Sequence, residues 1–355
     1  MANDQIDWKP LVEGASRAPS GDNTQPWEVS VAGNALELYY APTKAPGFYD
    51  VDNVSRYLAL GAWLHNFKVL SSHAGYRATV TLIPSGTVVA RITLEKGEEK
   101  IGDASAVLSR RTNRFPYQQK PLAPEQKEKL EKVLLPYGVT IAWLLGKDKE
   151  EFQCVAPELE NIFWKFPEHR TSLLSILKLG SAKSAETGIH RTHFGVAFGG
   201  VSAVLGLFLS RHVSLIWKMG CLAVASVDRR NLKHSSAVLL LYANAPDGLV
   251  QNTRREFWLT TGMALEEFWL ATTKEHLAVQ PFYSIIVFGL RKFFGLPVLT
   301  KKYAALEEHA NNILEKHRPN KNAVAFMCMR IGTPIKTPST LSLRKPFAKI
   351  LRASS

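Results

Sequence analysis

The sequence predicts an α+β fold made of two similar halves, with a helical insert in the second half. Helical patterns alternate with short strand patterns, one order of helix and strand occurs twice, and a long apolar stretch separates the two occurrences. The predicted halves are residues 1–105 and 106–355, and the insert covers about residues 147–233. A chain of 355 residues that is 46% apolar is large enough for a packed core of this kind.

The first half is predicted from its periodicity and its turn residues. Apolar residues recur at helical spacing, as at Leu58 and Phe67, or alternate with polar residues, while Pro, Ser, Gly and Asn mark the turns. The predicted order is a helix at residues 6–17, a turn at 19–26, strands at 27–31 and 36–40, a helix at 54–74, and two strands within 78–91.

The second half contains a helix pattern that aligns with the helix predicted at residues 54–74. Gly262 falls on Gly61 and Phe268 on Phe67, an offset of 201 residues. Two amphipathic helices can align by chance, but the matching order of helix, turn and strand favours a duplication. The apolar strands that follow the two helices are predicted at residues 88–94 and 324–331.

The insert contains a stretch without charge, residues 194–210. A membrane-spanning helix needs about 20 predominantly apolar residues, and this run is slightly shorter and holds four glycines, which favour close packing or a break. We therefore favour a buried helix or a lid, with contact at a membrane surface and a true span as the alternatives. A second apolar stretch, residues 281–299, is interrupted by Arg291 and Lys292 and could join it.

The composition narrows the class of protein without naming a partner. The net charge of +13 suits a polyanion, a phosphorylated cofactor, an anionic membrane surface or a solvated basic exterior. Three distant cysteines without a C-x-x-C pair, and the absence of a secretory signal, predict a cytoplasmic protein without zinc or disulfides. No metal site is predicted from the histidine spacing, and nucleic-acid binding is not predicted, because most tryptophans fall at apolar helix positions.

The first candidate site is the run Ala-Pro-Ser-Gly-Asp-Asn-Thr-Gln-Pro-Trp at residues 18–27. This turn presents a hydroxyl, two side-chain amides and several backbone N–H groups, which can hydrogen-bond a polar heterocycle or a polyol. The alternative is a structural turn with Pro26 and Trp27 in the core.

The second candidate site is Arg110-Arg111-Thr112-Asn113-Arg114, just past the end of a short predicted helix. Three guanidiniums and a hydroxyl within five residues suit a phosphate, because arginine offers paired donors and threonine adds another. A solvated basic surface is the alternative.

Together, the motifs A-P-S-x-x-N-x-Q-P-W and R-x-[S/T]-x-[R/K] resemble the nitroreductase superfamily of FMN-dependent enzymes. The tail, with Arg330-Ile331-Gly332 and later Leu343-Arg344-Lys345-Pro346, resembles the end of that family. The resemblance covers roughly residues 6–120 and 250–352 and leaves the insert without a counterpart.

The order of the two motifs is reversed relative to that family, in which the arginine motif comes first and each flavin lies between two subunits. The resemblance therefore implies two halves that mimic the family homodimer, as in its fused, Acg-like branch. One FMN per chain follows, because neither half carries both motifs in the family order. The chain is then expected to be a monomer built like a dimer, or a homodimer.

The resemblance also implies a set of FMN-binding residues and no catalytic side chain, because the flavin carries the chemistry. Arg110, Thr112 and Arg344 are expected at the phosphate, and Arg114 near the pyrimidine side of the ring. Residues 281–283 match the segment whose backbone N–H groups approach flavin N5, although His276 replaces the glycine that often begins it. The whole implied set is Arg17, Ser20, Asn23, Gln25, Arg110, Thr112, Arg114, Pro281, Phe282, Tyr283 and Arg344.

The function implied by the resemblance is hydride transfer through FMN, from NAD(P)H to a small acceptor such as a quinone or a nitroaromatic compound. The sequence leaves open two alternatives to this reaction. The insert could cover the flavin as a lid and make the chain a flavin-sequestration protein without turnover, or it could attach a flavoprotein to an anionic membrane surface.

Overall fold

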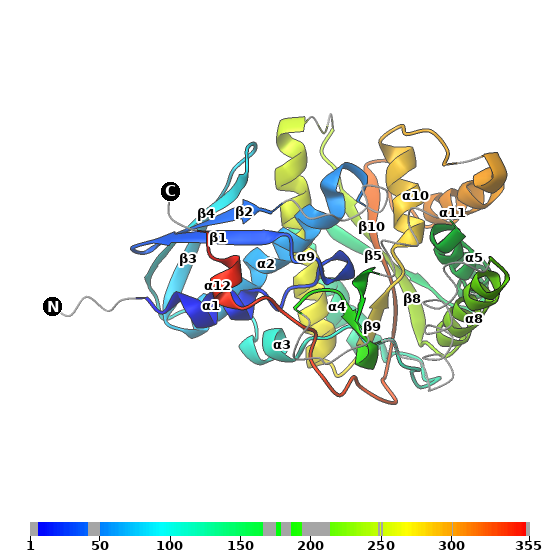
Figure 1. Ribbon diagram of the computed structural model, residues 1–355, viewed down its shortest axis with the longest axis horizontal. Coiled ribbons are helices and arrows are strands. Elements are labelled where there is room, and N and C mark those ends of the chain that lie inside the picture. Colours follow the sequence, from blue (N-terminus) through cyan, green and yellow to red (C-terminus); the bar gives the residue numbers. More distant parts are fainter. Residues whose placement is uncertain are drawn as a thin grey trace.

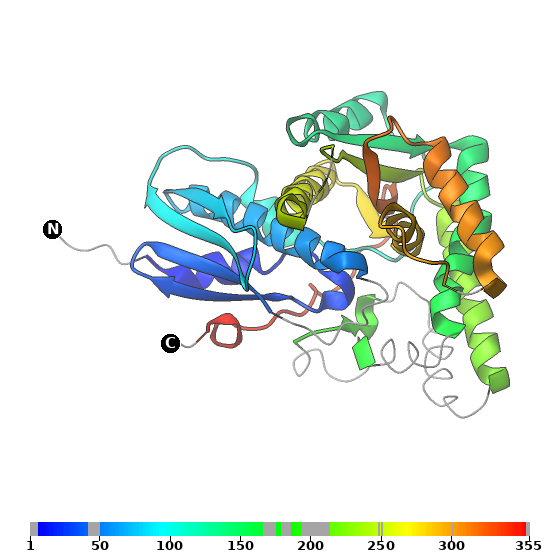
Figure 2. The ribbon, with the colours of Figure 1, turned by 90° about the horizontal axis from the view of Figure 1, so that it is seen from above.

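The fold is of the predicted α+β class, with one four-stranded antiparallel sheet in each half (Figure 1). The computed structural model describes residues 6–41, 50–165, 175–178, 186–193, 214–247, 249, 251–299 and 301–352. Figures 1 and 2 both place the long helices α2 (Val54–His73) and α9 (Gln251–Lys274) between the two sheets.

The first sheet has the strand order β1-β2-β4-β3. Along β4 several buried and exposed residues alternate, which is typical of a sheet that faces the core on one side. Helix α1 (Trp8–Ala15) and one face of α2 contribute to the core beneath it. The strands are β1 (Trp27–Ala32), β2 (Ala35–Tyr40), β3 (Tyr76–Leu82) and β4 (Val88–Lys96).

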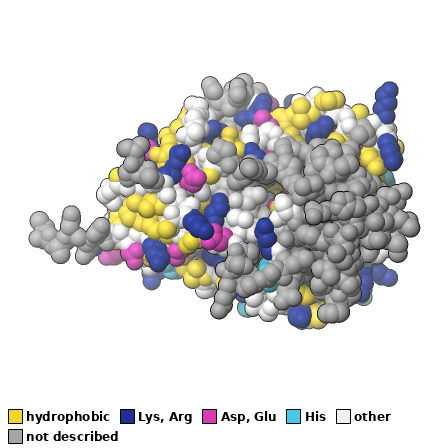
Figure 3. Space-filling view, in the orientation of Figure 1, with side chains coloured by type: hydrophobic (Ala, Val, Ile, Leu, Met, Phe, Trp, Pro, Cys, Tyr) yellow, Lys and Arg dark blue, Asp and Glu magenta, His cyan; other side chains and the backbone are white. Residues whose placement is uncertain are grey.

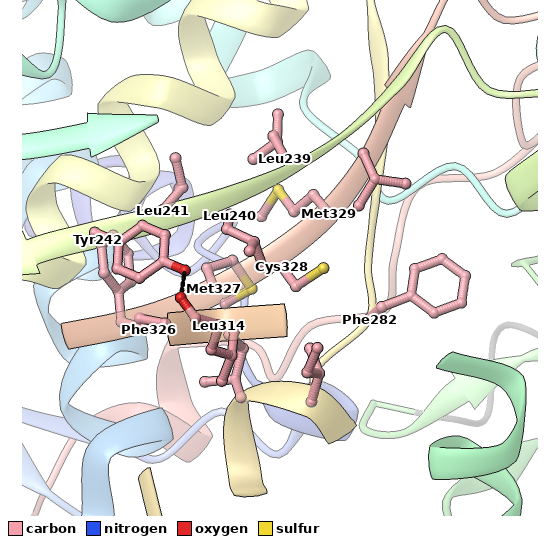
Figure 4. Packing of buried hydrophobic residues seen from close by; sticks show 14 of the residues in the cluster. Leu239, Leu240, Leu241, Tyr242, Phe282, Leu314, Phe326, Met327, Cys328 and Met329 are labelled. Atoms are coloured by element: carbon pink, nitrogen blue, oxygen red, sulfur yellow. Dashed lines mark hydrogen bonds between the residues drawn. The ribbon is translucent and has the colours of Figure 1, made fainter. Parts of the chain in front are cut away.

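The second sheet has the order β5-β8-β10-β9, and residues of its strands belong to the hydrophobic core of the second half. Its central strands β8 and β10 are buried along nearly their whole length, so their sequences are apolar without alternation. Figure 4 shows their side chains packed together, with the Tyr242 hydroxyl donating to the Leu314 carbonyl oxygen at 2.7 Å. The strands are β5 (Val139–Leu144), β8 (Ala237–Asn244), β9 (Ala278–Pro281) and β10 (Ala323–Gly332).

The two long helices of the predicted insert, α5 (Gly146–Lys165) and α8 (Ser214–Lys233), pack against each other beside the second sheet (Figure 2). Phe152 and Leu159 of α5 are fully buried in the core of the second half. The flanking helices therefore belong to that core, whereas the uncharged stretch 194–210 lies outside the described residues. None of the described helices is long and apolar enough to cross a membrane.

Helices α2 and α9 touch backbone to backbone at two glycines. A Cβ atom on Gly61 would lie 2.0 Å from the carbonyl oxygen of Leu259, and a Cβ atom on Gly262 would lie 2.3 Å from that of Leu58. The contact is reciprocal, because the offset of 201 residues carries Leu58 onto Leu259 and Gly61 onto Gly262. Residues that the alignment pairs therefore meet as residues do at a two-fold axis, and the duplication itself stays a prediction.

The tail crosses from the second half back to the first. After β10 the chain passes Arg344 and enters the short helix α12 (Phe347–Ile350), and Ile350 is buried in the core of the first half. The remaining helices are α3 (Ala104–Ser109), α4 (Pro124–Lys132), α10 (Ser284–Phe293) and α11 (Ala304–Lys316). Short 3₁₀ turns and strands complete the order, namely η1 (Gly21–Asn23), η2 (Val51–Asn53), η3 (Leu135–Tyr137), β6 (Leu177–Lys178), β7 (Ile189–His190), η5 (Arg191–His193) and η6 (Lys301–Tyr303).

Candidate functional site

The turn predicted at residues 19–26 holds three non-glycine residues in the left-handed region. Asp22, Asn23 and Gln25 have φ values of 53°, 55° and 53°. The Gln25 backbone N–H donates to the Ser20 hydroxyl at 3.1 Å and helps to close the turn. Left-handed backbone is unusual for residues other than glycine, and such residues cluster at active sites and ligand-binding segments. Three of them in one turn therefore favour a functional role for this turn.

Two arginines from the predicted set meet at the end of α3. Arg110 caps this helix, and its guanidinium donates to the carbonyl oxygen of Arg17. The Arg110 Nε atom lies 3.2 Å from Oε1 of Glu266 on α9, and its guanidinium sits 4.7 Å from the centre of the Trp269 ring. Arg110 and Glu266 are both buried, so this ion pair lies in the interior between the halves.

Arg344, from the C-terminal tail, lies beside Arg17 and Arg110. Its guanidinium donates to the carbonyl oxygens of Ser16, Arg17 and Ala18, and it also donates to Oδ1 of Asn23 at 2.9 Å. We call Arg17, Arg110 and Arg344 the arginine cluster. Three guanidiniums from three segments thus converge, because the tail crosses over the end of α1.

The arginine cluster carries more positive than negative charge. Burial and the repulsion of Arg110 and Arg17 lower the pKa of Arg344 well below its usual range. Burial, then repulsion from Arg110 and Arg111, lower the pKa of Arg17 to about 10. Glu266 offsets one of the three charges, and the buried Nε atom of Arg17 has no hydrogen-bond partner among the described residues. An anion beside the cluster would offset this excess of positive charge and could accept a hydrogen bond from the Arg17 Nε atom.

The side chains of Asn23 and Gln25 are joined to the insert and the tail. Asn23 donates to the carbonyl oxygens of Gly188 and Leu343 at 3.1 and 2.9 Å. Gln25 donates to the carbonyl oxygen of Glu186 at 2.7 Å and accepts from the Lys345 backbone N–H at 2.8 Å. The described piece of the insert at residues 186–193 therefore lies against the turn, and these amides bind protein groups in this structure.

Arg114 lies in a different group of charged side chains. Its positive charge acts to lower the pKa of Asp22 in the turn and of Asp228 on α8, and its guanidinium donates to the His193 carbonyl oxygen at 3.5 Å. We call Asp22, Arg114, Glu160, Asp228 and Arg330 the ionisable cluster. Each of these side chains is at least partly buried, and they come from both halves and from the insert helices.

Hydrogen bonds place this cluster beside the arginine motif. Asn231, one turn after Asp228 on α8, donates to the Arg114 carbonyl oxygen at 3.3 Å. Fully buried Arg330 donates to the carbonyl oxygens of Asn231 and Phe115 at 3.2 and 2.8 Å. The Arg330 guanidinium also lies 3.9 Å from the centre of the Tyr117 ring. Asp228 therefore projects toward the arginine loop from the insert side.

Carboxyl groups in this cluster retain their protons to a higher pH than usual. Burial, and then the neighbouring Glu160, raise the pKa of Asp228 to about 7, although Arg330 and Arg114 act in the opposite direction. Burial also raises the pKa of Glu160, which accepts from the Ser284 backbone N–H at 3.4 Å. Perturbed carboxyl groups in a shared polar interior are typical of sites that bind ligands or move protons.

The raised pKa of Asp228 predicts a pH dependence of stability. The folded protein favours the protonated Asp228 carboxyl. The stability that this proton contributes is complete below the ordinary aspartate pKa near 4 and is lost as pH rises through about 7. Asp228→Asn cannot ionise, and its melting temperature relative to the unmodified chain should therefore be higher at pH 8 than at pH 5. Thermal unfolding of both proteins across this pH range tests it, and parallel curves would contradict it.

The segment 281–283 follows β9 and begins α10. The Phe282 backbone N–H donates to the Cys328 carbonyl oxygen at 2.8 Å, and its ring packs in the core against Phe152 (Figure 4 shows the Phe282 side chain). Burial raises the pKa of Tyr283. His276, which replaces the family glycine, has φ 55°, so this position keeps the left-handed backbone that glycine would favour.

A pocket of about 440 Å³ opens beside the second candidate site. It lies between the end of α3, the end of α9 and the chain after β10. Its lining includes Ser109, Arg111, Asn113, Lys274, His276 and Thr337.

The structure brings most of the predicted set together, but in two groups. Arg17, Asn23, Arg110 and Arg344 are joined through hydrogen bonds, with Ser20 and Gln25 in the same turn. Arg114 belongs to the ionisable cluster, half-buried Thr112 lies on the loop between Arg110 and Arg114, and residues 281–283 adjoin Glu160 through Ser284. Sequence reasoning missed Glu266 and Asp228. For Glu266 a signal exists, since it stands on the same helical face as Gly262 and Trp269.

Comparison with known proteins gives sequence relatives over part of the chain. No family model matches the sequence. An uncharacterised protein of Mycobacterium tuberculosis (strain CDC 1551 / Oshkosh) is 24% identical over 287 residues, which are 79% of this chain and 39% of that protein. A predicted NAD(P)H nitroreductase of the same organism is 31% identical over 109 residues, 29% of this chain and 32% of the relative. The chain thus spans well under half the length of both relatives.

Solved structures with low similarity include two nitroreductases. The FMN- and NADPH-dependent nitroreductase NfnB of Sphigopyxis sp. strain HMH is 15% identical with a TM-score of 0.37, covering 72% of this chain and all of that chain. NfnB of Mycobacterium smegmatis, solved with NADPH, is 12% identical with the same TM-score and covers 70% and 96%. Likenesses at this level carry no weight for fold or function. The similarity to the mycobacterial nitroreductase covers 109 residues of this chain, and it agrees with the superfamily that the two motifs resemble.

Proposed function

We propose that this chain is an FMN-dependent oxidoreductase that holds one flavin between its two halves. The observation that carries the proposal is the arginine cluster, in which three guanidiniums, each at least partly buried, converge and the Glu266 carboxylate pairs with one of them, Arg110. An FMN phosphate carries negative charge and several acceptor oxygens, so it fits this donor set. The relation to the nitroreductase superfamily supports the same cofactor.

The residues would divide their roles according to the two groups. Arg17, Arg110 and Arg344 would bind the phosphate, while the Ser20 to Gln25 turn and Thr112 would border the rest of the cofactor. Arg114 would lie on the ring side, where its positive charge favours a negatively charged reduced ring. Residues 281–283 remain the proposed neighbours of the ring from the second half.

The chemistry that FMN supplies when bound is hydride transfer, here from NAD(P)H to a small organic acceptor such as a quinone or a nitroaromatic compound. The chain itself contributes the binding groups and a source of protons. Asp228, with its pKa near 7, is partly protonated at neutral pH and can donate from its carboxyl to an acceptor beside Arg114.

An absorption spectrum with cofactor extraction tests the proposal most directly. The purified chain should show a flavin band, and acid extraction should release close to one FMN per chain. Anaerobic addition of NADPH or NADH should bleach the band. A colourless protein that gains no flavin on reconstitution would overturn the cofactor and the reaction together.

Flavin sequestration without turnover is the second candidate, and one observation favours it. The amides of Asn23 and Gln25 are tied to the insert backbone at Gly188 and Glu186, and Lys349 pairs with the Glu186 carboxylate at 2.7 Å. A segment held in this way would restrict access to the turn. Stable flavin binding together with an oxidised band that persists under NADPH and NADH would favour this candidate over the reductase.

A further inference from the structure

One surface of the second half combines exposed apolar side chains with a basic rim. The last residue of α10, Phe293, and two residues of the loop after it, Leu296 and Val298, are exposed by 40%, 44% and 54% respectively. These residues lie within a span that begins with Arg291-Lys292 and ends with Lys301-Lys302. We call the three apolar side chains the apolar tip.

The loop is held in a shape that keeps the tip outward. The Leu296 backbone N–H donates to the Arg291 carbonyl oxygen at 2.8 Å, and the Arg291 guanidinium donates to the Pro297 carbonyl oxygen at 2.5 Å. The Leu299 backbone N–H donates to the buried Glu307 carboxylate at 3.2 Å. Gly295, at φ 64°, makes the turn between them. The tip is therefore presented by an ordered loop whose ends are fixed to α10 and α11.

Positive charge surrounds the tip. Lys292, Lys301 and Lys302 are exposed, and Arg254 at the start of α9 lies 4.9 Å from the centre of the Phe294 ring at the base of the loop. Nearby carboxylates offset part of this charge, since Lys292 lies 3.8 Å from Glu315 and Arg254 lies 2.8 Å from Asp52. Figure 3 shows hydrophobic and basic side chains next to each other at the upper right, over the end of α10 and the start of α11.

We propose that this surface, the apolar tip with its basic rim, docks the protein on an anionic bilayer. Apolar side chains of this size can enter the boundary between head groups and acyl chains while lysines beside them contact acidic head groups. A protein partner fits less well, because three side chains offer far less area than the roughly 800 Å² per partner that a standard interface buries. A second copy of this chain fits poorly too, since a symmetric contact would bring the two basic rims together.

Vesicle flotation with the full chain tests the proposal and does not depend on the flavin. The chain should float with vesicles of equal parts phosphatidylcholine and phosphatidylglycerol, and stay behind with phosphatidylcholine alone. The variant Phe293→Ser/Leu296→Ser/Val298→Ser should bind at least about tenfold more weakly. Lys301→Glu/Lys302→Glu should weaken binding by more than about 25-fold, since each lost cation accounts for about fivefold and the reversal adds repulsion.

A matched control replaces three exposed apolar side chains elsewhere. Leu108→Ser/Leu135→Ser/Ile335→Ser, at positions 51%, 70% and 64% exposed, should float like the unmodified chain. Circular dichroism of every variant checks that the fold is retained. Equal flotation of the tip variant and the control, or equal binding to neutral vesicles, would overturn the proposal. So would a dimer, measured by light scattering, that needs the tip while no vesicle binding occurs.

Discussion

Gly61→Ala is expected to lower the free energy of unfolding by about 3 kcal/mol or more. The new Cβ atom would lie 2.0 Å from the carbonyl oxygen of Leu259 and 2.8 Å from Cα of Gly262, and both atoms belong to the backbone of α9. A backbone atom cannot rotate away, so the two helices must move apart over their whole contact. Because α2 and α9 lie between the sheets, chemical denaturation should report the loss for the entire chain (Figure 1).

Gly262→Ala is the reciprocal test and should have a comparable effect, since its Cβ atom would lie 2.3 Å from the Leu58 carbonyl oxygen. Gly14→Ala is the control. Its Cβ atom would clash only with Cδ1 of Leu70, at 2.4 Å, which is the movable end of a side chain, and alanine is the better helix former. If Gly61→Ala and Gly262→Ala are as stable as the control, the packing of α2 on α9 does not depend on this close approach.

Arg17→Gln is expected to weaken FMN binding by about 10-fold to 100-fold, as follows from the loss of charged hydrogen bonds of about 1.5–3 kcal/mol. The Arg17 guanidinium makes one hydrogen bond among the described residues, to the Ser342 carbonyl oxygen at 3.2 Å, so the flavin-free fold loses little when this side chain is replaced. The substitution also removes repulsion from Arg110. The flavin-free variant should therefore be at least as stable as the unmodified chain, and a flavin fluorescence titration with thermal unfolding measures both quantities.

Inorganic phosphate tests the phosphate-binding role of the arginine cluster apart from any contact with the flavin ring. It should raise the melting temperature of the flavin-free chain, because it binds only the folded state, and the rise should be much smaller in Arg17→Gln. Arg91→Gln serves as the control, because Arg91 is 65% exposed and pairs with Glu37 on the first sheet. Unchanged FMN affinity in Arg17→Gln would count against the arginine cluster as the phosphate site.

The local elements of this protein follow from its sequence. The helices at Trp8–Ala15 and Val54–His73 and the strands at Trp27–Ala32 and Ala35–Tyr40 lie where periodicity and turn residues predict them. These patterns suffice because each depends on neighbours a few residues away. The alignment of Gly61 with Gly262 was also readable, although only the structure shows these residues in contact.

The resemblance to the nitroreductase superfamily likewise comes from two short motifs, but the sequence did not reveal how their side chains would be used. Spacing alone does not predict that Asn23 and Gln25 bind the backbone of residues 186–188, or that Arg344 reaches back to the end of α1. These contacts join segments more than 150 residues apart along the chain, and they depend on the path of the tail and the insert.

The charges of the candidate site were decided by the tertiary structure. In the sequence Arg110 stands in a run of basic residues that suits a solvated surface as well as a phosphate, and Glu266 is one acidic residue in a long helix. Folding buries both side chains together and adds Arg17 and Arg344, while Asp228 comes from a distant helix to the side of Arg114. The sequence by itself determined which ionisable groups exist. Burial and the distances between them set their pKa values, because both depend on the solvent that the packed chain removes.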